Sequence, residues 1–426
     1  MRVVFVQFGA FAEAERRFAA GGAETFYAQK YSVELLSRLA KTVEDLTVLH
    51  VGRDDAEERL PSGVRSLGIQ LYPPGQAPRH LDLIRALRRL RPDHLIAVSP
   101  LPYVIGWALL SGVRVLPILA DSFGDERLKA RLKAGVLARL LNNRRIDWVS
   151  NHALAASLDL ARIGVSPAKV LPFDWPALIP ADRFAPKEPP AGSELRAIFV
   201  GQMAEMKGPG DLIQAIALLK AAGGAGGRRW RATLVGGTNE ALARKAQELG
   251  VADRVEFAGR VPHDSIVALM NQHDAVVVPS WHEYGEGLPM TIYEGLCSRT
   301  PLVVSDHRMF RLKVTHGEDA LVFPARHPEA LANSLDLLAR DGDLYRRLSA
   351  AGQTAAADFF CPLKYDQLIT RWLSGTEEDR RELASYSLAS GRYDATLSKR
   401  GIEIPVLSAA GGPLRTLLRG VQPSSW

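Results

Sequence analysis

The chain alternates short apolar runs with helical patterns along most of its length, and this rhythm constrains its fold more than any other feature. Apolar runs of four to eight residues are typical of buried strands, and apolar residues spaced three and four apart are typical of helices. In the first half, the expected strands are Val3–Phe8, Leu46–Val51, His94–Val98, Val113–Leu119, Trp148–Ser150 and Val170–Phe173. The expected helices between them are Tyr27–Ala40, Leu81–Leu90, Tyr103–Leu110 and a basic segment at 126–145. This βαβ alternation predicts a doubly wound parallel sheet.

A proline-rich break interrupts the rhythm, and we place a linker near Phe184–Ser193. The same alternation then restarts. The expected strands are Ala197–Val200, Trp230–Val235, Val255–Phe257, Ala275–Val278 and Leu302–Val304, and the expected helices are Pro209–Ala222, Glu240–Leu249, Ser265–Asn271, Thr291–Ser298 and Pro328–Arg340. The sequence therefore predicts an α/β protein with two doubly wound, Rossmann-like domains that face each other across a cleft.

The predicted boundaries are 1–188 for the first domain, 189–358 for the second, and 359–426 for a last segment. That segment is expected to begin with a helix over Phe359–Trp372. A charged helical stretch, Glu377–Ala389, comes next, and the remaining tail is expected to be loosely ordered or packed along the surface. A chain of 426 residues is too long for one ordinary core, which agrees with two domains.

Composition bears on the compartment in which the protein works. Two cysteines, Cys297 and Cys361, exclude a disulfide framework and suit a reducing compartment. The first residues form a strand-like run and lack the apolar core of a signal peptide. The longest apolar stretch, Tyr103–Ala120, contains Arg114, two glycines and a proline, so a buried helix followed by a strand is preferred to a membrane span. We therefore expect a cytoplasmic protein.

The segment 126–145 carries seven Lys or Arg residues against one acid, an excess equal to the net charge of +6 of the whole chain. Its apolar residues are Leu128, Leu132, Val136, Leu137, Leu140 and Leu141. The pattern predicts a basic amphipathic helix. Two interpretations stay open: a surface helix with an ordinary core face, or a helix that docks on an anionic membrane surface. Nucleic-acid binding is not expected, because no aromatic interleaving or known module accompanies the charge.

Two glutamates separated by seven residues, Glu286 and Glu294, follow the strand-like run 274–280. Gly287 lets the backbone approach a ligand closely. Pro289 suits the first turn of a helix, whose amides near Met290 and Thr291 would attract an anion. Glu294, about one turn further, could accept hydrogen bonds from sugar hydroxyls. The segment suits a nucleotide sugar, with phosphates on the amides and hydroxyls on the carboxylates.

Other loops follow predicted strands. They contain Gly201 and Gln202 with Lys207-Gly208, then Gly236-Gly237, then Gly259, and in the first domain Gly21-Gly22 and Asp121. The glycines could let amides cradle phosphate or sugar oxygens, and the lysine could reach a phosphate. Each also has a plain structural explanation: a solvated lysine, a simple turn, or a helix N-cap for the aspartate. The histidines are scattered, and no metal site is predicted.

Taken in order, these segments resemble the retaining, metal-independent family-4 glycosyltransferases of GT-B fold. The resemblance covers roughly residues 1–375 and is densest over 197–340. It implies that Lys207 binds the donor diphosphate and that Glu294 holds the ribose hydroxyls. It also implies that Glu286 holds hydroxyls of the donor sugar near its anomeric carbon. The donor-site loops implied are those of Gly201, Gln202, Gly236 and Gly237, with the backbone of Gly287, Leu288, Met290 and Thr291.

In the first domain the resemblance implies that Gly21 and Gly22 line the cleft opposite the diphosphate. Asp121 stands where many relatives carry a His or Asp that contacts the donor sugar and the reacting centre. No cofactor or metal is implied, and the donor would be a UDP- or GDP-sugar. The acceptor would be a saccharide or a lipid-linked saccharide.

Three departures from the family pattern stand out. Many relatives have Gly-Arg where this chain has Gly201-Gln202, so half of the usual cationic phosphate clamp is missing. The loop Trp281–Gly285 is longer than is common and brings in Glu283, a rival for the role of Glu286, although the spacing to Glu294 favours Glu286. The stretch Ala10–Ala20 is also long and is a candidate gate on the acceptor side.

The sequence therefore predicts a hexosyltransferase-type enzyme that moves a sugar from a nucleotide-diphosphate sugar to a hydroxyl, with retention. The basic segment suggests work at the inner face of the plasma membrane, in bacterial surface polysaccharide assembly. Two alternatives remain. One is a nucleotide-sugar epimerase or phosphorolytic enzyme of the same fold. The other is a catalytically silent sugar-nucleotide-binding protein, which the neutral Gln202 would suit.

Overall fold

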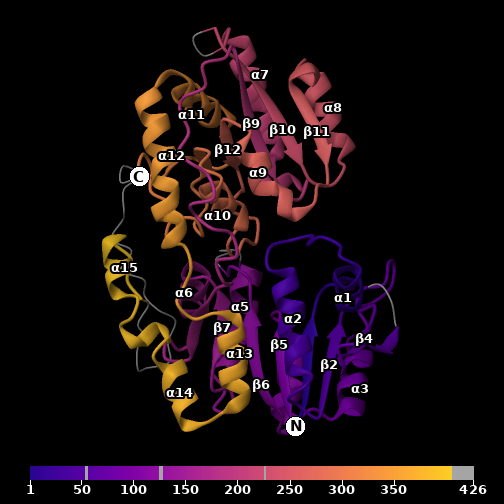
Figure 1. Cartoon of the computed structure of the whole chain (residues 1–426). Coiled ribbons are helices and arrows are strands. Elements are labelled where there is room, and N and C mark those ends of the chain that lie inside the picture. The colour runs from indigo at the N-terminus through magenta and orange to yellow at the C-terminus, as the bar shows by residue number, and fades with distance from the viewer. Residues whose placement is uncertain (53–55, 124–127, 225–226, 405–426) are drawn as a thin grey trace. The chain divides into compact units, whose positions relative to one another are not determined.

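The computed structural model describes residues 1–52, 56–123, 128–224 and 227–404 (Figure 1). The chain divides into two compact units. The N-terminal unit comprises Met1–Pro176 together with the described residues from Phe360 onward, and the C-terminal unit is Ala177–Phe359. The division therefore falls at 176/177 and 359/360, whereas the predicted domain boundaries are 188/189 and 358/359.

The N-terminal unit contains one sheet in the order β3-β4-β2-β1-β5-β6-β7-β8. Its strands are β1 Arg2–Gln7, β2 Asp45–His50, β3 Glu57–Arg59, β4 Arg65–Gly68, β5 His94–Val98, β6 Arg114–Leu119, β7 Val149–His152 and β8 Val170–Phe173. All neighbours pair in parallel except β3 with β4. The six predicted strands are confirmed. The sequence does not indicate β3 and β4, because β3 is a charged edge strand and β4, with the sequence RSLG, has a single large apolar side chain.

The helices of this unit are α1 Phe11–Ala19, α2 Gln29–Leu39, α3 His80–Leu90, α4 Pro102–Ser111, α5 Leu128–Leu141, α6 Leu154–Arg162, α13 Tyr365–Ser374, α14 Glu377–Ala384 and α15 Asp394–Lys399. Helix α4 and strand β6 occupy the long apolar stretch, as predicted. None of the helices in the described ranges combines the length and the hydrophobicity that a bilayer crossing requires.

The last helices return to the N-terminal unit, where Figure 1 shows them in yellow beside its strands. Leu368, Ile369 and Trp372 of α13 are buried in the same core as strands β1, β2 and β6. Tyr393 and Leu397 are also buried, so the described part of the tail is packed against the unit. The predicted helix at Phe359 begins only at Tyr365, because Pro362 disfavours helical geometry in the residue before it. Residues 405–426 of the predicted tail lie outside the described residues.

The C-terminal unit contains one parallel sheet in the order β11-β10-β9-β12-β13-β14. Its strands are β9 Glu194–Val200, β10 Arg229–Val235, β11 Val255–Gly259, β12 Ala275–Val278, β13 Leu302–Ser305 and β14 Ala320–Phe323. Its helices are α7 Pro209–Ala221, α8 Glu240–Glu248, α9 Ile266–Asn271, α10 Met290–Cys297, α11 Pro328–Arg340 and α12 Gly342–Ala357. The chain moves outward from β9 to β11 and then crosses back to β12 on the other side of β9. This switch point is where open α/β sheets bind ligands.

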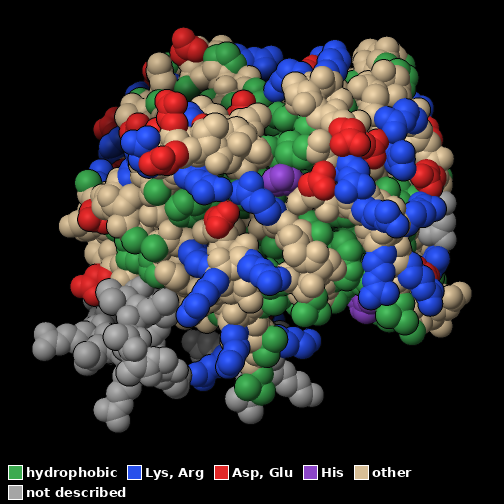
Figure 2. All heavy atoms as spheres, turned by 90° about the horizontal axis from the view of Figure 1, so that it is seen from below, with side chains coloured by type: hydrophobic (Ala, Val, Ile, Leu, Met, Phe, Trp, Pro, Cys, Tyr) green, Lys and Arg blue, Asp and Glu red, His purple; other side chains and the backbone are tan. Residues whose placement is uncertain are grey.

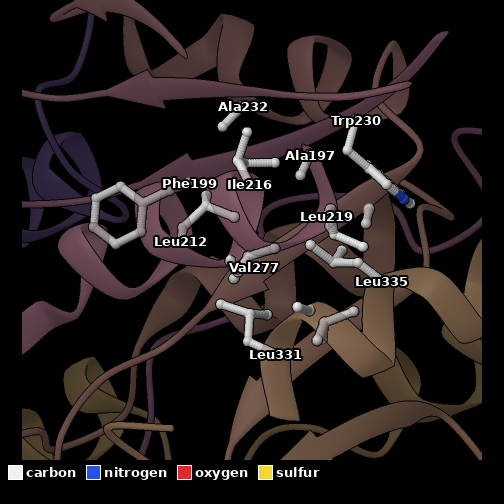
Figure 3. Packing of buried hydrophobic residues seen from close by; sticks show 14 of the residues in the cluster. Ala197, Phe199, Leu212, Ile216, Leu219, Trp230, Ala232, Val277, Leu331 and Leu335 are labelled. Carbon is white, nitrogen blue, oxygen red and sulfur yellow. The ribbon is translucent and has the colours of Figure 1, made fainter. Parts of the chain in front are cut away.

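Apolar side chains on one face of the sheet and on the helices that cover it form a core of this unit (Figure 3). Leu212, Ile216 and Leu219 recur at helical spacing on α7, and Leu331 and Leu335 do the same on α11. They pack against strand residues such as Ala197, Phe199 and Val277. Burial of such side chains stabilises by roughly 1.5–3 kcal/mol each, and here it fixes the strand ends from which the site loops leave.

The basic helix α5 departs from its predicted apolar face. Leu137, Ala138 and Leu141 are buried, but Leu132 and Val136, expected on the core side, are 64% and 67% exposed. Val136 and Leu137 lie about 100° apart around a helix. Packing that centres on Leu137 and Leu141 therefore turns Leu132 and Val136 outward. The structure does not describe 124–127, nor the side chains of Leu128 and Lys129. The described part of α5 therefore presents apolar as well as basic side chains to solvent.

Candidate functional site

Glycine loops meet at the carboxyl ends of β9, β10 and β11 in the C-terminal unit. Gly201 donates its N–H to the Val235 carbonyl at 3.0 Å, and Gly236 donates to the Gly259 carbonyl at 2.9 Å. A Cβ at position 236 would collide with the Gly201 carbonyl oxygen. Gly236 is therefore required by the close approach of two strand ends, and not simply by a turn. The neighbouring Gly237 lies close to the guanidinium of Arg260, the residue that follows β11.

The Lys207-Gly208 pair lies against the end of β12. Gly208 has φ +75°, and a Cβ there would collide with the carbonyl of Pro279. The Trp281 N–H donates to the Met206 carbonyl at 2.8 Å, which ties the lysine loop to the loop after β12. Two loops far apart in sequence are thereby held together at the switch point, and the lysine side chain points into the second loop.

Lys207 and Glu286 form an ion pair between Nζ and Oε1, and their side chains are only 16% and 7% exposed. Ser280 Oγ donates to the same carboxylate oxygen at 2.8 Å. Glu283, the rival carboxylate, is 51% exposed and pairs with Arg326 at 2.7 Å. The structure thus places Glu286, and not Glu283, beside the predicted phosphate-binding lysine, as the spacing to Glu294 favours.

Glu294 is buried on α10 and contacts a residue that the sequence did not single out. Its Oε1 lies 2.6 Å from Nε2 of His263, with side chains that are 5% and 14% exposed. His263 follows β11 by four residues, and one histidine after a strand carries no pattern that would have identified it. The tertiary structure supplies this partner.

Helix α10 begins at Met290, one residue before the predicted start at Thr291. Pro289 is its N-cap residue, with φ −71° and ψ 113°, and not part of its first turn. Thr291 Oγ1 donates to the Val200 carbonyl at 3.3 Å and so anchors the helix start to the end of β9. Gly287 and Leu288, between the glutamate and the helix, are buried. The first-turn amides of Met290 and Thr291 therefore lie at the switch point, where a helix N-terminus favours an anion.

Tyr284 connects several of these groups. Its hydroxyl donates to Oε1 of Gln202 at 3.3 Å, and its ring centroid lies 4.5 Å from the Lys207 ammonium. His307, which is fully buried, lies with Nε2 at 3.2 Å from the Tyr284 carbonyl. Burial lowers the pKa of His307 to about 4, so the ring is neutral near pH 7 and Nε2 carries the donated proton. Neither residue was predicted from the sequence.

The predicted site residues of the N-terminal unit lie beyond β1 and β6. Asp121 follows β6, its carbonyl accepts from Asn151 Nδ2 at 2.9 Å, and burial raises the pKa of its carboxyl group. The stretch 10–20, predicted as a gate, is mostly helix α1. Its contribution to an acceptor site remains a prediction.

Gly21 and Gly22 close the C-terminal end of α1. Gly21, with φ +75°, donates to the Phe18 carbonyl at 3.0 Å, and Gly22 donates to the Arg17 carbonyl at 2.8 Å. This is the Schellman arrangement that caps helix carbonyls. Helix capping uses both N–H groups here, and the role of Gly21 and Gly22 beside the diphosphate stays a prediction. Among the described residues, no group of His, Cys, Asp or Glu is arranged to hold a metal ion.

Comparison with known proteins agrees with this geometry. Residues 181–355 match the family model described as glycosyl transferases group 1. A D-inositol 3-phosphate glycosyltransferase of Nocardia farcinica is 30% identical over 168 residues, which is 38% of this chain and 36% of that protein. The match thus spans little more than a third of the length of that relative.

Two solved structures show the fold over most of the chain. HepE of Anabaena, solved in complex with UDP and glucose, aligns over 88% of this chain and 100% of its own, with TM-score 0.63 and 16% identity. WaaG, a glycosyltransferase involved in lipopolysaccharide biosynthesis, covers 84% of this chain and 95% of its own, with TM-score 0.58 and 15% identity. Residues 181–355 therefore match a glycosyl transferases group 1 domain, and the chain has the GT-B fold of these solved structures.

Proposed function

We propose that this protein is a retaining, metal-independent glycosyltransferase that uses a nucleoside-diphosphate sugar. The observation that carries the proposal is the buried Lys207–Glu286 pair at the β9/β12 switch point, beside the start of α10. A cation, a helix N-terminus and two buried carboxylates suit a ligand that bears both phosphates and hydroxyls. HepE, which shares the fold, was solved with UDP-glucose, and this supports a UDP-sugar before a GDP-sugar.

In the proposed reaction the lysine ammonium and the first-turn amides of α10 hold the diphosphate. Glu294 accepts hydrogen bonds from the ribose, and Glu286 accepts them from the sugar. The bond between the anomeric carbon and the diphosphate oxygen breaks, and the acceptor oxygen bonds to that carbon on the same face. The acceptor proton passes to the leaving diphosphate. The protein contributes positioning and charge stabilisation, and none of its side chains has to act as a strong base.

We further propose that the acceptor is a lipid-linked saccharide at an anionic membrane surface. Helix α5 exposes Leu132 and Val136 between the exposed cations Arg131, Lys133 and Arg139. Figure 2 shows Lys and Arg side chains gathered with hydrophobic ones on the face seen from below. An exposed apolar stripe flanked by cations is typical of helices that lie in a membrane interface. WaaG, a structural neighbour, acts in lipopolysaccharide biosynthesis.

The donor proposal is tested by thermal shift with UDP, GDP and ADP and their sugars, followed by transfer assays. One nucleotide should raise the melting temperature in proportion to the logarithm of its concentration over Kd. Lys207→Ala and Glu294→Ala should abolish transfer, and the product should keep the anomeric configuration of the donor by NMR. Binding without hydrolysis or transfer would instead support the silent binding protein that Gln202 suggests.

The membrane proposal is tested by flotation with liposomes that contain phosphatidylglycerol. Wild type should float at moderate salt. The double variant Arg131→Glu with Lys133→Glu should not, and Leu132→Glu should float less. Arg244→Glu, an exposed arginine on α8 of the other unit, is the matched control and should float like wild type. Failure of wild type to float, or flotation unchanged by the α5 variants, would contradict the proposal.

The acceptor requires its own comparison, because the sequence relatives are named D-inositol 3-phosphate glycosyltransferases. A phosphorylated polyol is therefore the alternative acceptor class. Transfer to inositol 3-phosphate, with no transfer to a lipid-linked saccharide, would overturn the lipid-linked assignment and leave the donor proposal intact.

A further inference from the structure

Two departures from the family pattern contact each other in the structure. The family resemblance implies an arginine at the position of Gln202 and a shorter loop than 281–285. Tyr284 belongs to that loop, and its hydroxyl reaches Gln202 Oε1 at 3.3 Å. The extra loop length therefore delivers a hydrogen-bond donor to the position where a cationic donor is missing.

The ring of Tyr284 also contacts the remaining cation of the site. The Lys207 ammonium lies over it, 4.5 Å from its centroid, while the same ammonium pairs with the Glu286 carboxylate. An aromatic face attracts an ammonium electrostatically and holds it without neutralising its charge. Lys207 can therefore leave Glu286 for a phosphate and remain in contact with the ring.

The backbone of Tyr284 is fixed by the same groups that order the site. Its carbonyl accepts from the Glu286 N–H at 2.8 Å and from His307 Nε2 at 3.2 Å. The phenol is half-buried, and burial together with the charge of Glu286 raises the pKa of Tyr284. The hydroxyl consequently keeps its proton at neutral pH and can donate it in a hydrogen bond.

We propose that Tyr284, held by Gln202, replaces the missing arginine as a donor to the diphosphate. When the donor substrate binds, the hydroxyl turns from Gln202 to an oxygen of the terminal phosphate, and the ring keeps Lys207 beside it. The inference rests on the proposed function and adds a residue specific to this chain. It explains how a site with one clamp cation instead of two can still hold the leaving group. The neutral phenol supplies one of the hydrogen bonds that an arginine would donate, although it supplies no charge.

The test compares a nucleoside diphosphate with its monophosphate by isothermal titration calorimetry. UDP and UMP are the first pair, and GDP with GMP or ADP with AMP replaces them if wild type selects that base. Tyr284→Phe should weaken UDP binding by about tenfold, the usual worth of a hydrogen bond to a charged group, and leave UMP binding within twofold. Tyr284→Leu, which also removes the ring, should weaken UDP further.

A second variant isolates the substitution for arginine. Gln202→Arg should restore UDP binding to the Tyr284→Phe protein. When Tyr284→Phe is made in the Gln202→Arg protein, it should weaken UDP binding by less than threefold. The coupling between the two positions is the quantity measured. Tyr386→Phe, at a tyrosine whose hydroxyl contacts Glu382 in the N-terminal unit, is the matched control and should bind UDP like wild type.

The outcomes separate the two proposals. Unchanged UDP binding by Tyr284→Phe, or equal losses for UDP and UMP, would overturn this inference and leave the glycosyltransferase proposal standing. A wild-type protein that binds none of the nucleoside diphosphates would overturn both. Retained folding of each variant is checked by its unfolding midpoint, so that a misfolded loop is not mistaken for a lost contact.

Discussion

The ammonium of Lys207 and the carboxylate of Glu286 form an almost completely buried ion pair in which Ser280 supplies a further hydrogen bond. The two residues are 79 positions apart, and the pair joins the loop after β9 to the loop after β12. In this structure each charge neutralises the other. Donor binding has to redirect both, since the lysine is needed at the phosphates and the glutamate at the sugar.

We expect removal of one partner of the pair to destabilise the protein more than removal of both. Lys207→Met leaves the buried Glu286 carboxylate without its cation, and should lower the free energy of unfolding by about 3 kcal/mol. The double variant Lys207→Met with Glu286→Leu should recover a large part of that loss, because no buried charge remains unpaired. Urea unfolding of wild type, Lys207→Met, Glu286→Leu and the double variant measures the coupling between the two charges. Additive losses would show that the two charges do not interact.

Removal of His263 should weaken nucleotide binding without selecting for the second phosphate. His263 lies against Glu294, so His263→Ala frees the carboxylate to rotate, and affinity should fall about fivefold for UDP and UMP alike. His263→Gln keeps a donor and should lose less. Calorimetric titration measures both ligands, and His327→Gln, at an exposed histidine before α11, is the control. A loss confined to UDP would contradict a role at the ribose.

The buried His307 should make stability depend on pH. Its pKa is about 4 in the folded protein against about 6.5 unfolded, because burial disfavours the charged ring. Between these values the unfolded chain binds more protons, so the free energy of unfolding rises with pH. The contribution is complete above about pH 6.5 and is lost as pH falls to about 4, a change of about 3 kcal/mol.

His307→Gln isolates this effect from the other groups that titrate in the same range. Urea unfolding of both proteins between pH 7 and pH 4 should show the stability of wild type falling more steeply than that of the variant. Parallel curves would mean that the ring already carries a charge in the folded protein, or that it is not buried in solution.

Gly208 should tolerate no side chain. It combines φ +75° with a collision between any Cβ and the Pro279 carbonyl, so Gly208→Ala should lower the free energy of unfolding by about 2–3 kcal/mol. Gly285→Ala is the control, since a Cβ there meets no atom within 4 Å and its φ is not positive. Chemical unfolding measures both variants. Equal stability of the two proteins would contradict the close packing of the lysine loop against β12.

The sequence was sufficient for the architecture because periodicity is a local property. Strands such as β1 and β12 are apolar runs whose central residues are buried, and they were located within a residue. A short charged edge strand such as β3 contributes little apolar surface and leaves no such pattern. The outward face of α5 shows the same limit, since several apolar stripes compete on one helix and tertiary packing selects among them.

The order of motifs along the chain also identified Lys207, Glu286 and Glu294, because their spacing within loops and helix starts is written in the sequence. Their partners could not be identified in this way. His263, Tyr284 and His307 reach the site from three different strand ends, so they come together only when β11, β12 and β13 take their places in one sheet. The sequence alone determined the two sheets and the order of the loops. Tertiary structure decided which side chains those loops bring into contact, since such contacts depend on distances through space that no local pattern encodes.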